Sequence, residues 1–549
     1  SCSCGLWICA SYVVKRECSI LFFVCVRACT RPFMSVSIQV SVRCRPFVCD
    51  DELGVSMFQN SPDEGEINLL RSKYSTNRFA FSWAWWSAYG YKNHCASEES
   101  KNDADSMKLI DQATMYEACG KKIQEQLYDG NAIVLFAYGL SGSGKTFTVF
   151  GPDAVDIPEA WFKWSEPHKM WGVFPHLAYE CFQDREDGWK LTMKYFQNVV
   201  DIVRDLMSPV AQEQNYKQGM RKDKDGFTDI EWCSSAVLKD WDAMRTTFQG
   251  ANARKAIAPT QFNPQSTRGH CIMTLEVEKP KKDDPSTKQK GRVYVCDLAG
   301  TEPAGDVVYA MYKKKKFDDG SIENQYQGPH PDKQKTKELQ DQGKKINLSL
   351  SEMAQFFMKM ADAIKKKKLK PGQSIPGCNS YFLCKYLKDT MLCARTYLFC
   401  AIRPEVKFHP YTFSTLGFAK NASVIKLQPK KATTAATPAE RKLMEELEKM
   451  KLMMAELQAG GGGGGGNDPA KDAEIQRLQE MLANQQKNLA DELAGSGGHS
   501  ESDAMLERQK QEYGRRGIVM TAFGSDETEP FFVNIDEDEF RSERFMYVL

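Results

Sequence analysis

The spacing of apolar and polar residues predicts a large domain of strands and helices followed by two short helices. Ser37 to Cys44 alternates as a strand does, and the apolar run Ile133 to Tyr138 predicts a second strand. Asp111 to Leu127 is predicted to be a helix ahead of this second strand. A chain of 549 residues can hold one large α/β domain with appendages.

The pattern changes after Pro438, where apolar residues follow the spacing of a heptad seam. The seam consists of Leu443, Leu447, Met450, Met454 and Leu457. It covers only about two heptads, fewer than the three or four that firmly indicate a coiled coil. The alternative is an amphipathic helix that lies on the large domain.

A second, weaker seam follows a glycine-rich tether. Gly460 to Gly466 interrupts any helix and makes a flexible connection. The next helix, predicted over Ile475 to Leu493, repeats the seam except at Gln485. The two short helices could pair with each other or with a partner chain, and the sequence does not choose between these arrangements.

Charge is concentrated in local blocks. The formal net charge is +1, which argues against a general attraction to nucleic acid or to a membrane surface. Lys313 to Lys316 lies in a polar insertion between Pro303 and Lys337, which we expect to be a mobile, solvated loop. The longest apolar run near the start, Ile20 to Val26, is far shorter than the roughly 20 residues of a membrane-spanning helix.

The 18 cysteines and seven histidines show no zinc-binding spacing in the sequence. Cys44 and Cys296 lie in predicted core strands and are interpreted as buried free thiols in a reducing cytosol. Residues 1–33 contain six cysteines, and we expect them to be a non-native or disordered leader, such as an upstream translation. The alternative is a short signal peptide, although its apolar core is short and no initiating Met precedes it.

The most informative motif is a phosphate-binding loop. Gly139-Leu140-Ser141-Gly142-Ser143-Gly144-Lys145-Thr146 fits the pattern GxxxxGK[ST], with a predicted strand before it and a helix start after it. Glycines let backbone N–H groups turn toward phosphate oxygens. Lys145 can reach the β and γ phosphates, and the Thr146 hydroxyl can bind Mg²⁺. The alternative is a chance glycine-rich turn.

Two later segments have the composition of nucleotide switches. They are Asn263-Pro264-Gln265-Ser266-Thr267-Arg268-Gly269-His270 and Asp297-Leu298-Ala299-Gly300-Thr301-Glu302. An Asp at the end of a strand suits a water-mediated Mg²⁺ contact, and a Gly three residues later can lend its amide to the γ-phosphate. Each segment alone is typical of an ordinary turn, but the order of the three motifs makes a chance match improbable.

In these motifs the chain resembles a kinesin motor domain, whose switches read NxxSSRSH and DLAGSE. Three further stretches are similar to the family's RxRP, INKSL and STLRYA elements: Arg43-Cys44-Arg45-Pro46, Ile346-Asn347-Leu348-Ser349-Leu350 and Ser414-Thr415-Leu416-Gly417-Phe418-Ala419. The resemblance covers roughly Ser37 to Lys426. It implies an α/β P-loop NTPase fold, with a central, mainly mixed β-sheet flanked by helices on both faces and followed by short helices or a coiled coil.

Three features resemble the kinesin-3 subfamily. Phe79 to Ser87 is similar to FSFDYSYWS, and the run from Lys365 to Lys370 stands where kinesin-3 has a lysine-rich loop. Pro530 to Asp538 resembles the PHLVNLNED that opens a forkhead-associated domain. The last match discriminates best between subfamilies.

The resemblance implies ATP and Mg²⁺ as cofactors and assigns catalytic roles. Lys145 would neutralise phosphate charge, Thr146 and Thr267 would sit at Mg²⁺, and Asp297 would hold a Mg²⁺-bound water. Ser266 would contact the attacking water, and Gly300 would sense the γ-phosphate. Arg268 and Glu302 would form the ion pair that closes the switches around ATP.

The resemblance also implies the surrounding contacts. Arg43, Arg45 and Pro46 would line the base pocket, and Asn263 would join the phosphate loop in binding the nucleotide. The acidic surface of tubulin would be bound by Lys365, Lys366, Lys367, Lys368 and Lys370.

Some positions depart from the family pattern. Gly269 and Thr267 replace switch I serines, and we expect the glycine to loosen that loop. Pro303 follows Glu302 where the family usually has Arg. Pro376 to Ser380 replaces PYRDS and so lacks an aromatic and two charged side chains. Gly417 and Lys420 replace the Arg of STLRYA and the Asp that follows it. These departures affect the track-binding and neck-linker segments more than the nucleotide site.

The domain boundaries follow from these assignments. We divide the chain into a leader (1–33), a motor domain (34–426), a neck linker (427–437), a short coiled-coil helix (438–459), a Gly-rich linker (460–470), a second short helix (471–494), a linker (495–527) and a truncated start of a forkhead-associated-like domain (528–549).

The resemblance implies a microtubule-dependent motor that couples ATP hydrolysis to movement, located in the cytoplasm on the cytoskeleton and serving cargo transport. The alternative is a nucleotide-gated microtubule-binding or scaffold protein with weak or no motility. A phosphate-loop GTPase is disfavoured because the sequence has no NKxD element. The sequence does not identify the cargo, and a homodimer through the short coiled coil is one option.

Overall fold

The computed structural model describes residues 36–47, 49–281, 283–316, 322–370, 372–435, 437–459, 469–498, 531–533 and 546–548. The predicted leader and most of the Gly-rich linker, the later linker and the forkhead-associated-like tail lie outside the described residues. Two short paired strands are described in the tail, β23 (Phe531–Val533) and β24 (Met546–Val548).

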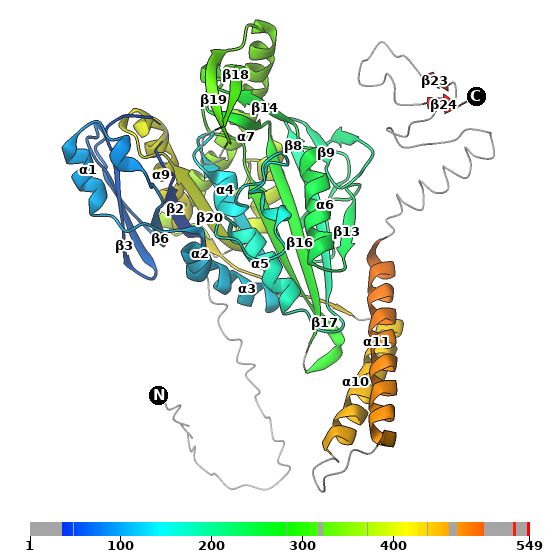
Figure 1. Cartoon of the computed structure of the whole chain (residues 1–549). Coiled ribbons are helices and arrows are strands. Elements are labelled where there is room, and N and C mark those ends of the chain that lie inside the picture. The colour runs from blue at the N-terminus through cyan, green and yellow to red at the C-terminus, as the bar shows by residue number, and fades with distance from the viewer. Residues whose placement is uncertain are drawn as a thin grey trace, which may run out of the picture. The chain divides into compact units, whose positions relative to one another are not determined.

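A mixed sheet forms the centre of the large domain (Figure 1). Its strands follow the order β10 (Gln212–Asn215), β9 (Ile202–Asp205), β8 (Lys190–Val199), β16 (His270–Lys281), β17 (Asp284–Asp297), β7 (Ala132–Gly139), β20 (Arg395–Ile402), β2 (Gln39–Cys44) and β6 (Trp83–Trp86). The strands from β17 to β6 run parallel to their neighbours, whereas those from β10 to β17 pair antiparallel. β13 (Ser235–Leu238) joins β8 beside this path.

Strand β7 shows why the sheet is covered on both faces. All eight of its residues are buried, and alternate side chains enter two different apolar clusters. Ile133 and Leu135 face one cluster, while Val134 and Phe136 face the other. Side chains of a strand alternate between faces, so an apolar strand of this kind must be enclosed by helices on both sides.

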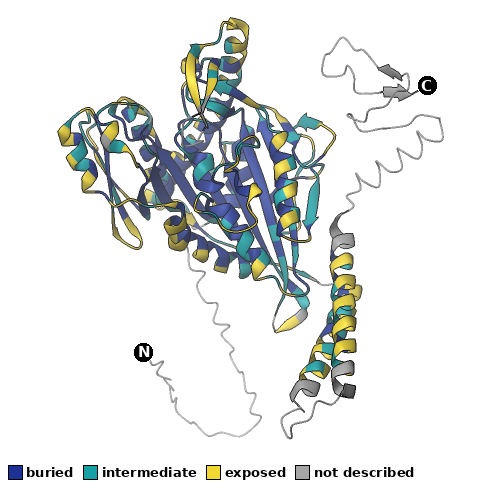
Figure 2. Ribbon diagram, viewed as in Figure 1, coloured by how far each residue is buried: buried dark blue, intermediate teal, exposed yellow. Residues whose placement is uncertain are grey.

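The helices divide between these two faces (Figures 1 and 2). One cluster includes residues of α7 (Lys333–Lys365), α8 (Phe382–Leu392) and α9 (His409–Ser423). The other includes residues of α3 (Lys121–Tyr128), α5 (Val173–Gln183) and α6 (Trp241–Ala253). The predicted helix from Asp111 to Leu127 is confirmed: α2 (Gln112–Met115) continues through a π-helical segment, Tyr116–Gly120, into α3.

Smaller elements surround the sheet. They are α1 (Glu98–Asp105), α4 (Lys145–Val149), the sheet β3 (Val55–Ser61), β4 (Glu64–Leu69) and β5 (Arg78–Phe81), the pair β1 (Val36–Ser37) and β21 (Lys426–Leu427), the hairpins β11 (Met220–Lys222) with β12 (Thr228–Ile230) and β14 (Ile257–Thr260) with β15 (Asn263–Thr267), and the 3-10 turns Tyr91–Asn93, Trp161–Lys163, Ala304–Asp306 and Val406–Phe408.

The polar insertion after switch II is more ordered than we predicted. β18 (Ala310–Lys316) pairs with β19 (Ile322–Pro329), and α7 already begins at Lys333. The hairpin is anchored because the Tyr312 hydroxyl donates to the Thr260 carbonyl over 2.6 Å and Lys314 pairs with Asp156 over 2.9 Å. The prediction of a mobile loop from Pro303 to Lys337 is therefore wrong; apolar residues inside the insertion, such as the buried Val307, find a core of their own.

The two short helices pair with each other, which is one of the two arrangements that the sequence left open. α10 (Pro438–Ala459) and α11 (Pro469–Gly498) bury Leu447, Leu489 and Leu493 between them. Before α10, β22 (Ala432–Ala435) adds to the end of β17. Lys288 of β17 and Glu440 of α10 form an ion pair at 2.8 Å with both side chains 3 % exposed. This pair and the added strand tie the start of α10 to the large domain.

None of the helices in the described residues is long and apolar enough to cross a bilayer.

Candidate nucleotide site

The phosphate loop connects β7 to α4, and glycine geometry shapes it. Gly142 and Gly144 have φ values of 69° and 101°, in the left-handed region that favours glycine. A Cβ on Gly139 would lie 2.2 Å from the Ala401 carbonyl oxygen, so this position also has no room for a side chain. The loop thus has the tight backbone that a phosphate cradle requires.

Lys145 lies inside the loop. Its ammonium donates to the carbonyl oxygens of Gly139 and Leu140 over 3.0 and 3.1 Å, and the residue is 8 % exposed. Burial lowers the pKa of this lysine, and the nearby carboxylates of Glu302 and Asp297 oppose that shift. Among the described residues, the hydrogen bonds of this buried cation go to neutral carbonyl groups, so it is well placed to attract an anion.

Thr146 and Asp297 meet at the carboxyl ends of two adjacent strands. The Thr146 hydroxyl donates to Asp297 Oδ2 over 2.7 Å, whereas the buried Asp297 Oδ1 has no hydrogen-bond partner among the described residues. Burial raises the pKa of this carboxyl group, and the charges of Lys255 and Lys145 and the Thr146 hydrogen bond oppose the shift. A hydroxyl beside a carboxylate with a spare oxygen offers the hard ligands that Mg²⁺ prefers, so these residues fit the ion.

The two switch segments meet at one small cavity beside the loop. Ser266, Thr267 and Arg268 line it together with Gly300 and Glu302, and its volume is about 20 Å³. The segments are joined to the phosphate loop through Glu302, whose carboxylate accepts hydrogen bonds from the backbone N–H of Ser141 over 2.9 Å and from its hydroxyl over 2.6 Å. Residues more than a hundred positions apart in the sequence therefore share one site.

The expected ion pair between Arg268 and Glu302 is not formed. Arg268 instead donates to the Ser266 hydroxyl over 2.5 Å, and within the described part of the chain its buried Nε has no hydrogen-bond partner. Glu302 is held by the two donors of Ser141, which explains why it does not reach the arginine. Burial lowers the pKa of Arg268, and the charge of Glu302 opposes this, so the two groups are near each other without being paired.

The residues expected at the base pocket separate into two groups. Arg45 lies against the loop, where it donates to the Gly142 carbonyl, and Pro46 follows it. Arg43 is buried beneath α4 and donates to Gln112 over 2.7 Å and to the Thr148 hydroxyl over 3.3 Å. These hydrogen bonds join β2 to α2 and α4.

Asn263 caps its own turn at the β14–β15 hairpin. Its side-chain oxygen accepts from the Gln265 backbone N–H over 3.0 Å. The hairpin itself covers the phosphate loop closely, since a Cβ on Gly142 would meet the Phe262 carbonyl oxygen at 2.4 Å. Ser143 also lies in the loop, and its buried hydroxyl finds no partner in the described residues.

Sequence reasoning missed a buried ion pair beside the site. Lys255 and Asp153 are joined at 2.9 Å, with side chains 5 % and 20 % exposed. The charge of Lys255 opposes the rise in the pKa of Asp297, so the lysine influences the candidate Mg²⁺ ligand from a distance. No motif surrounds Lys255, and only its place just before the switch I segment could have indicated a role.

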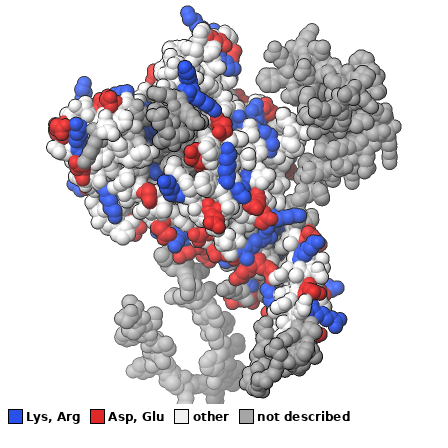
Figure 3. Space-filling model, viewed as in Figure 1, with Lys and Arg blue, Asp and Glu red and all other residues white. Residues whose placement is uncertain are grey.

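The lysine-rich segment lies at the far end of α7. The helix ends at Lys365, and Lys365, Lys366, Lys367, Lys368 and Lys370 are all exposed. Before α8, the carboxylate of Glu352 accepts from the backbone N–H groups of Ser380 and Tyr381 over 2.7 and 3.0 Å. In the view of Figure 3, basic and acidic side chains are interspersed over the surface, in keeping with the near-zero net charge.

Comparison with known families matches residues 86–324 to the kinesin motor domain. Kinesin-related protein 1 of Dictyostelium discoideum is 24% identical over 548 residues, covering 93% of this chain and 22% of that protein. Kinesin-like protein KIF1B of Rattus norvegicus is 23% identical over 436 residues, covering 76% of this chain and 21% of that protein. The chain therefore spans about a fifth of the length of these relatives.

Kinesin-like protein KIF22 of Danio rerio is 28% identical over 327 residues, covering 58% of this chain and 43% of that protein. Among solved structures, a KIF14 dimer in a two-heads-bound state, with AMP-PNP and in complex with a microtubule, matches with a TM-score of 0.53 and 20% identity. That match covers 75% of this chain and 100% of the KIF14 chain. It bears out the expected fold with its mixed sheet and flanking helices.

Proposed function

The chain carries a kinesin motor domain, and on this premise we propose that it is a microtubule-dependent motor that couples ATP hydrolysis to movement along microtubules. One observation supports the proposal most: the phosphate loop is hydrogen-bonded to switch II at two points. Thr146 bonds Asp297 and Ser141 bonds Glu302. A change at a bound phosphate would therefore act directly on the segment that leads to α7.

The loop residues would bind the triphosphate of ATP. Backbone N–H groups near Gly142 and Gly144 and the buried ammonium of Lys145 would hold the phosphate oxygens, and Arg45 would contact the base. Mg²⁺, when bound to Thr146 and Asp297, would supply positive charge to the phosphates. Hydrolysis at such sites depends on placement and electrostatics, so these side chains would orient the substrate and stabilise charge.

The switch residues would detect the γ-phosphate and close around it. Ser266 and Thr267 lie in the same cavity as Gly300, and Arg268 would reach Glu302 once that carboxylate leaves Ser141. We propose that the described state precedes this closure. The exchange is local, because Arg268 and Glu302 line the same cavity.

The signal would leave the site through α7. The Asn347 side chain donates to the Glu302 carbonyl over 2.8 Å, which joins switch II to this helix. The same helix ends at Lys365, and the exposed lysines Lys366, Lys367, Lys368 and Lys370 follow it. We propose that these lysines bind the acidic surface of the microtubule, where they would speed capture and prolong attachment.

A nucleotide-gated microtubule-binding or scaffold protein with weak or no motility is the second candidate. The unformed Arg268–Glu302 pair and the uncharged segment Pro376–Ser380 favour it, since both would weaken coupling between hydrolysis and the track. We further propose residence in the cytoplasm on microtubules, with the cargo unidentified.

Phosphate release from the full chain tests the proposal. Release should require ATP, and saturating microtubules should raise its rate at least about tenfold. Microtubule co-sedimentation in the presence of AMP-PNP should be measured on the same preparation. Binding without stimulation would select the scaffold candidate, and loss of both would reject the microtubule assignment. Single-molecule runs on microtubules would then show whether hydrolysis produces movement.

A further inference from the structure

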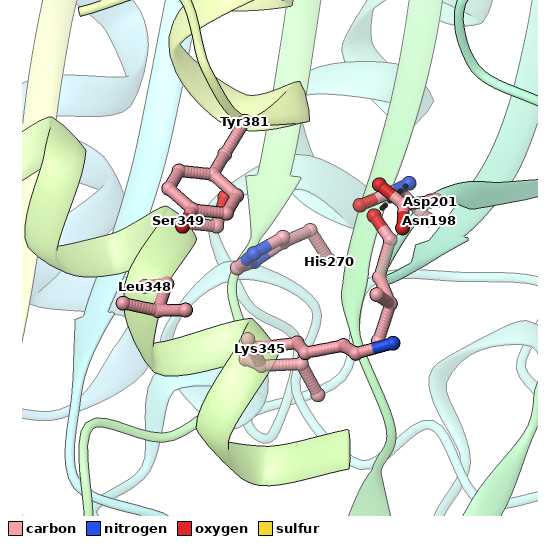
Figure 4. A pocket seen from close by; sticks show the side chains of 9 residues that line it. Asn198, Asp201, His270, Lys345, Leu348, Ser349 and Tyr381 are labelled. Carbon is pink, nitrogen blue, oxygen red and sulfur yellow. Dashed lines mark hydrogen bonds between the residues drawn. The ribbon is translucent and has the colours of Figure 1, made fainter. Parts of the chain in front are cut away.

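A second, larger cavity lies between the sheet and α7, away from the phosphate loop. It is lined by residues of the β8–β9 turn, by His270 and by the stretch of α7 from Lys345 to Ser349, and Tyr381 at the start of α8 closes one side (Figure 4). Its volume is about 230 Å³. This is many times the space that one water molecule needs, so the cavity has room for a small organic ligand.

His270 presents an unused hydrogen-bond donor to this cavity. The residue is 1 % exposed, and its Nδ1 accepts the backbone N–H of Ala299 over 3.4 Å. In neutral imidazole one nitrogen accepts and the other carries the proton, so Nε2 is the donor. Burial lowers the pKa of His270 to about 4, which keeps the ring neutral at pH 7. Nε2 has no partner among the described residues.

Ser349 presents a second unused group from the opposite wall. This serine is 6 % exposed, and over the described residues its buried hydroxyl has no hydrogen-bond partner. Figure 4 shows it on the helix that faces the His270 ring, next to Tyr381. Two unpartnered polar groups in one cavity are unusual, because buried polar atoms are nearly always hydrogen-bonded. A ligand that satisfied both would remove their desolvation cost.

We propose that this cavity binds a small aromatic carboxamide. The carbonyl oxygen accepts from His270 Nε2, the amide nitrogen donates to the Ser349 hydroxyl, and the ring packs against Tyr381 and Leu348. A neutral amide fits better than a carboxylate, because the buried imidazole is neutral and an anion would have to be desolvated there. Lys345 and Asp201 also line the cavity, and both are exposed residues of opposite charge.

Binding there would act on the switch machinery. Ala299, the partner of His270, belongs to the switch II segment, and Ile346 lines both this cavity and the small switch cavity. A ligand that joins His270 to Ser349 would hold α7 against the sheet and slow nucleotide exchange, a consequence that rests on the proposed function.

Ligand-observed NMR with benzamide on the full chain tests the binding. Saturation transfer to benzamide is expected with the unmodified chain, and benzoate of the same shape should bind at least about tenfold more weakly. Ser349→Ala and His270→Leu should each weaken benzamide binding about tenfold, the loss expected for one hydrogen bond to a buried group. Ser165→Ala, at an exposed serine outside the cavity, is the matched control and should bind normally.

Several results would overturn the proposal. They are no benzamide transfer at millimolar concentration, equal binding by all three variants, or tighter binding of benzoate. If His270→Leu does not fold, judged by circular dichroism, Ser349→Ala decides alone. Release of a fluorescent ADP analogue with and without benzamide tests the coupling and should slow at least twofold. Failure of the analogue to bind would reject the proposed function while the NMR result still stands.

Discussion

The nucleotide site and the lysine-rich end of α7 differ in how firmly their charged groups are held. At the nucleotide site, Lys145, Asp297 and Glu302 are buried and each has defined hydrogen-bond partners. At the end of α7, Lys365 and the lysines that follow it are exposed. Buried charges act through geometry, whereas exposed ones act through long-range attraction that salt screens. A single substitution should therefore have a large effect at the nucleotide site and a small one at the end of the helix.

The largest effect is expected from Lys145→Ala. This change removes the only ammonium held inside the phosphate loop by Gly139 and Leu140 in the described structure. ATP-dependent phosphate release should fall at least about a hundredfold, because charge at the phosphates is the main source of catalysis in such sites. Lys122→Ala, an exposed lysine on α3, should leave the rate unchanged. Equal rates for both variants would refute the assignment of the loop.

Gly269→Ser, which restores the serine of the family pattern, should destabilise the domain by about 3 kcal/mol. Gly269 has a φ of 127°, and a Cβ there would lie 2.0 Å from the Asn198 carbonyl oxygen. The midpoint of thermal unfolding of the Gly269→Ser protein should be clearly lower than that of the unmodified chain. Gly417→Ala is the control, since a Cβ at Gly417 in α9 meets nothing within 4 Å and alanine favours helices. A Gly269→Ser protein as stable as the control would contradict this account.

Glu440→Gln should loosen the helical pair by about 2 kcal/mol, because it leaves the buried Lys288 ammonium without its carboxylate. Hydrogen exchange should then quicken in α10 and β22 while the sheet stays protected. Glu448→Gln, at an exposed position of α10, is the matched control and should leave hydrogen exchange unchanged. Faster exchange in both variants, or in neither, would show that the ion pair does not tie α10 to the domain.

The smallest effect is expected at the lysines. Replacing Lys365, Lys366, Lys367 and Lys368 by Gln should weaken microtubule co-sedimentation about fivefold at low salt and hardly at all at high salt. A chain with Gln at the exposed Lys121, Lys122, Lys442 and Lys449 carries the same net charge. If this control loses as much binding, total charge rather than the position of the lysines determines attachment.

The sequence was most informative where one local motif determines geometry. The phosphate loop, the strand ahead of it and the α/β class could all be predicted, since GxxxxGK[ST] requires a tight turn between a strand and a helix. The meeting of Thr267 and Gly300 at one cavity was a weaker prediction, because it depends on how β15 and β17 are placed by the sheet.

Other features depended on tertiary contacts that no local pattern reveals. Gly269 was expected to loosen its loop, yet the backbone there requires glycine. The Arg268–Glu302 pair was expected from motif residues alone, whereas Ser141 competes for the same carboxylate. The pairing of α10 with α11 depends on which apolar seam is nearest, and the short seams of the sequence are compatible with either partner.

The length of α7 determines the direction in which the residues at its end point. At 33 residues the helix is a rod of about 50 Å, and each added residue turns everything beyond it by about 100°. Insertion of one alanine near Met358 would leave composition and charge almost unchanged but would point Lys365 and its neighbours in a different direction. The protein can therefore vary the residues on the outer face of this rod more freely than it can vary their number.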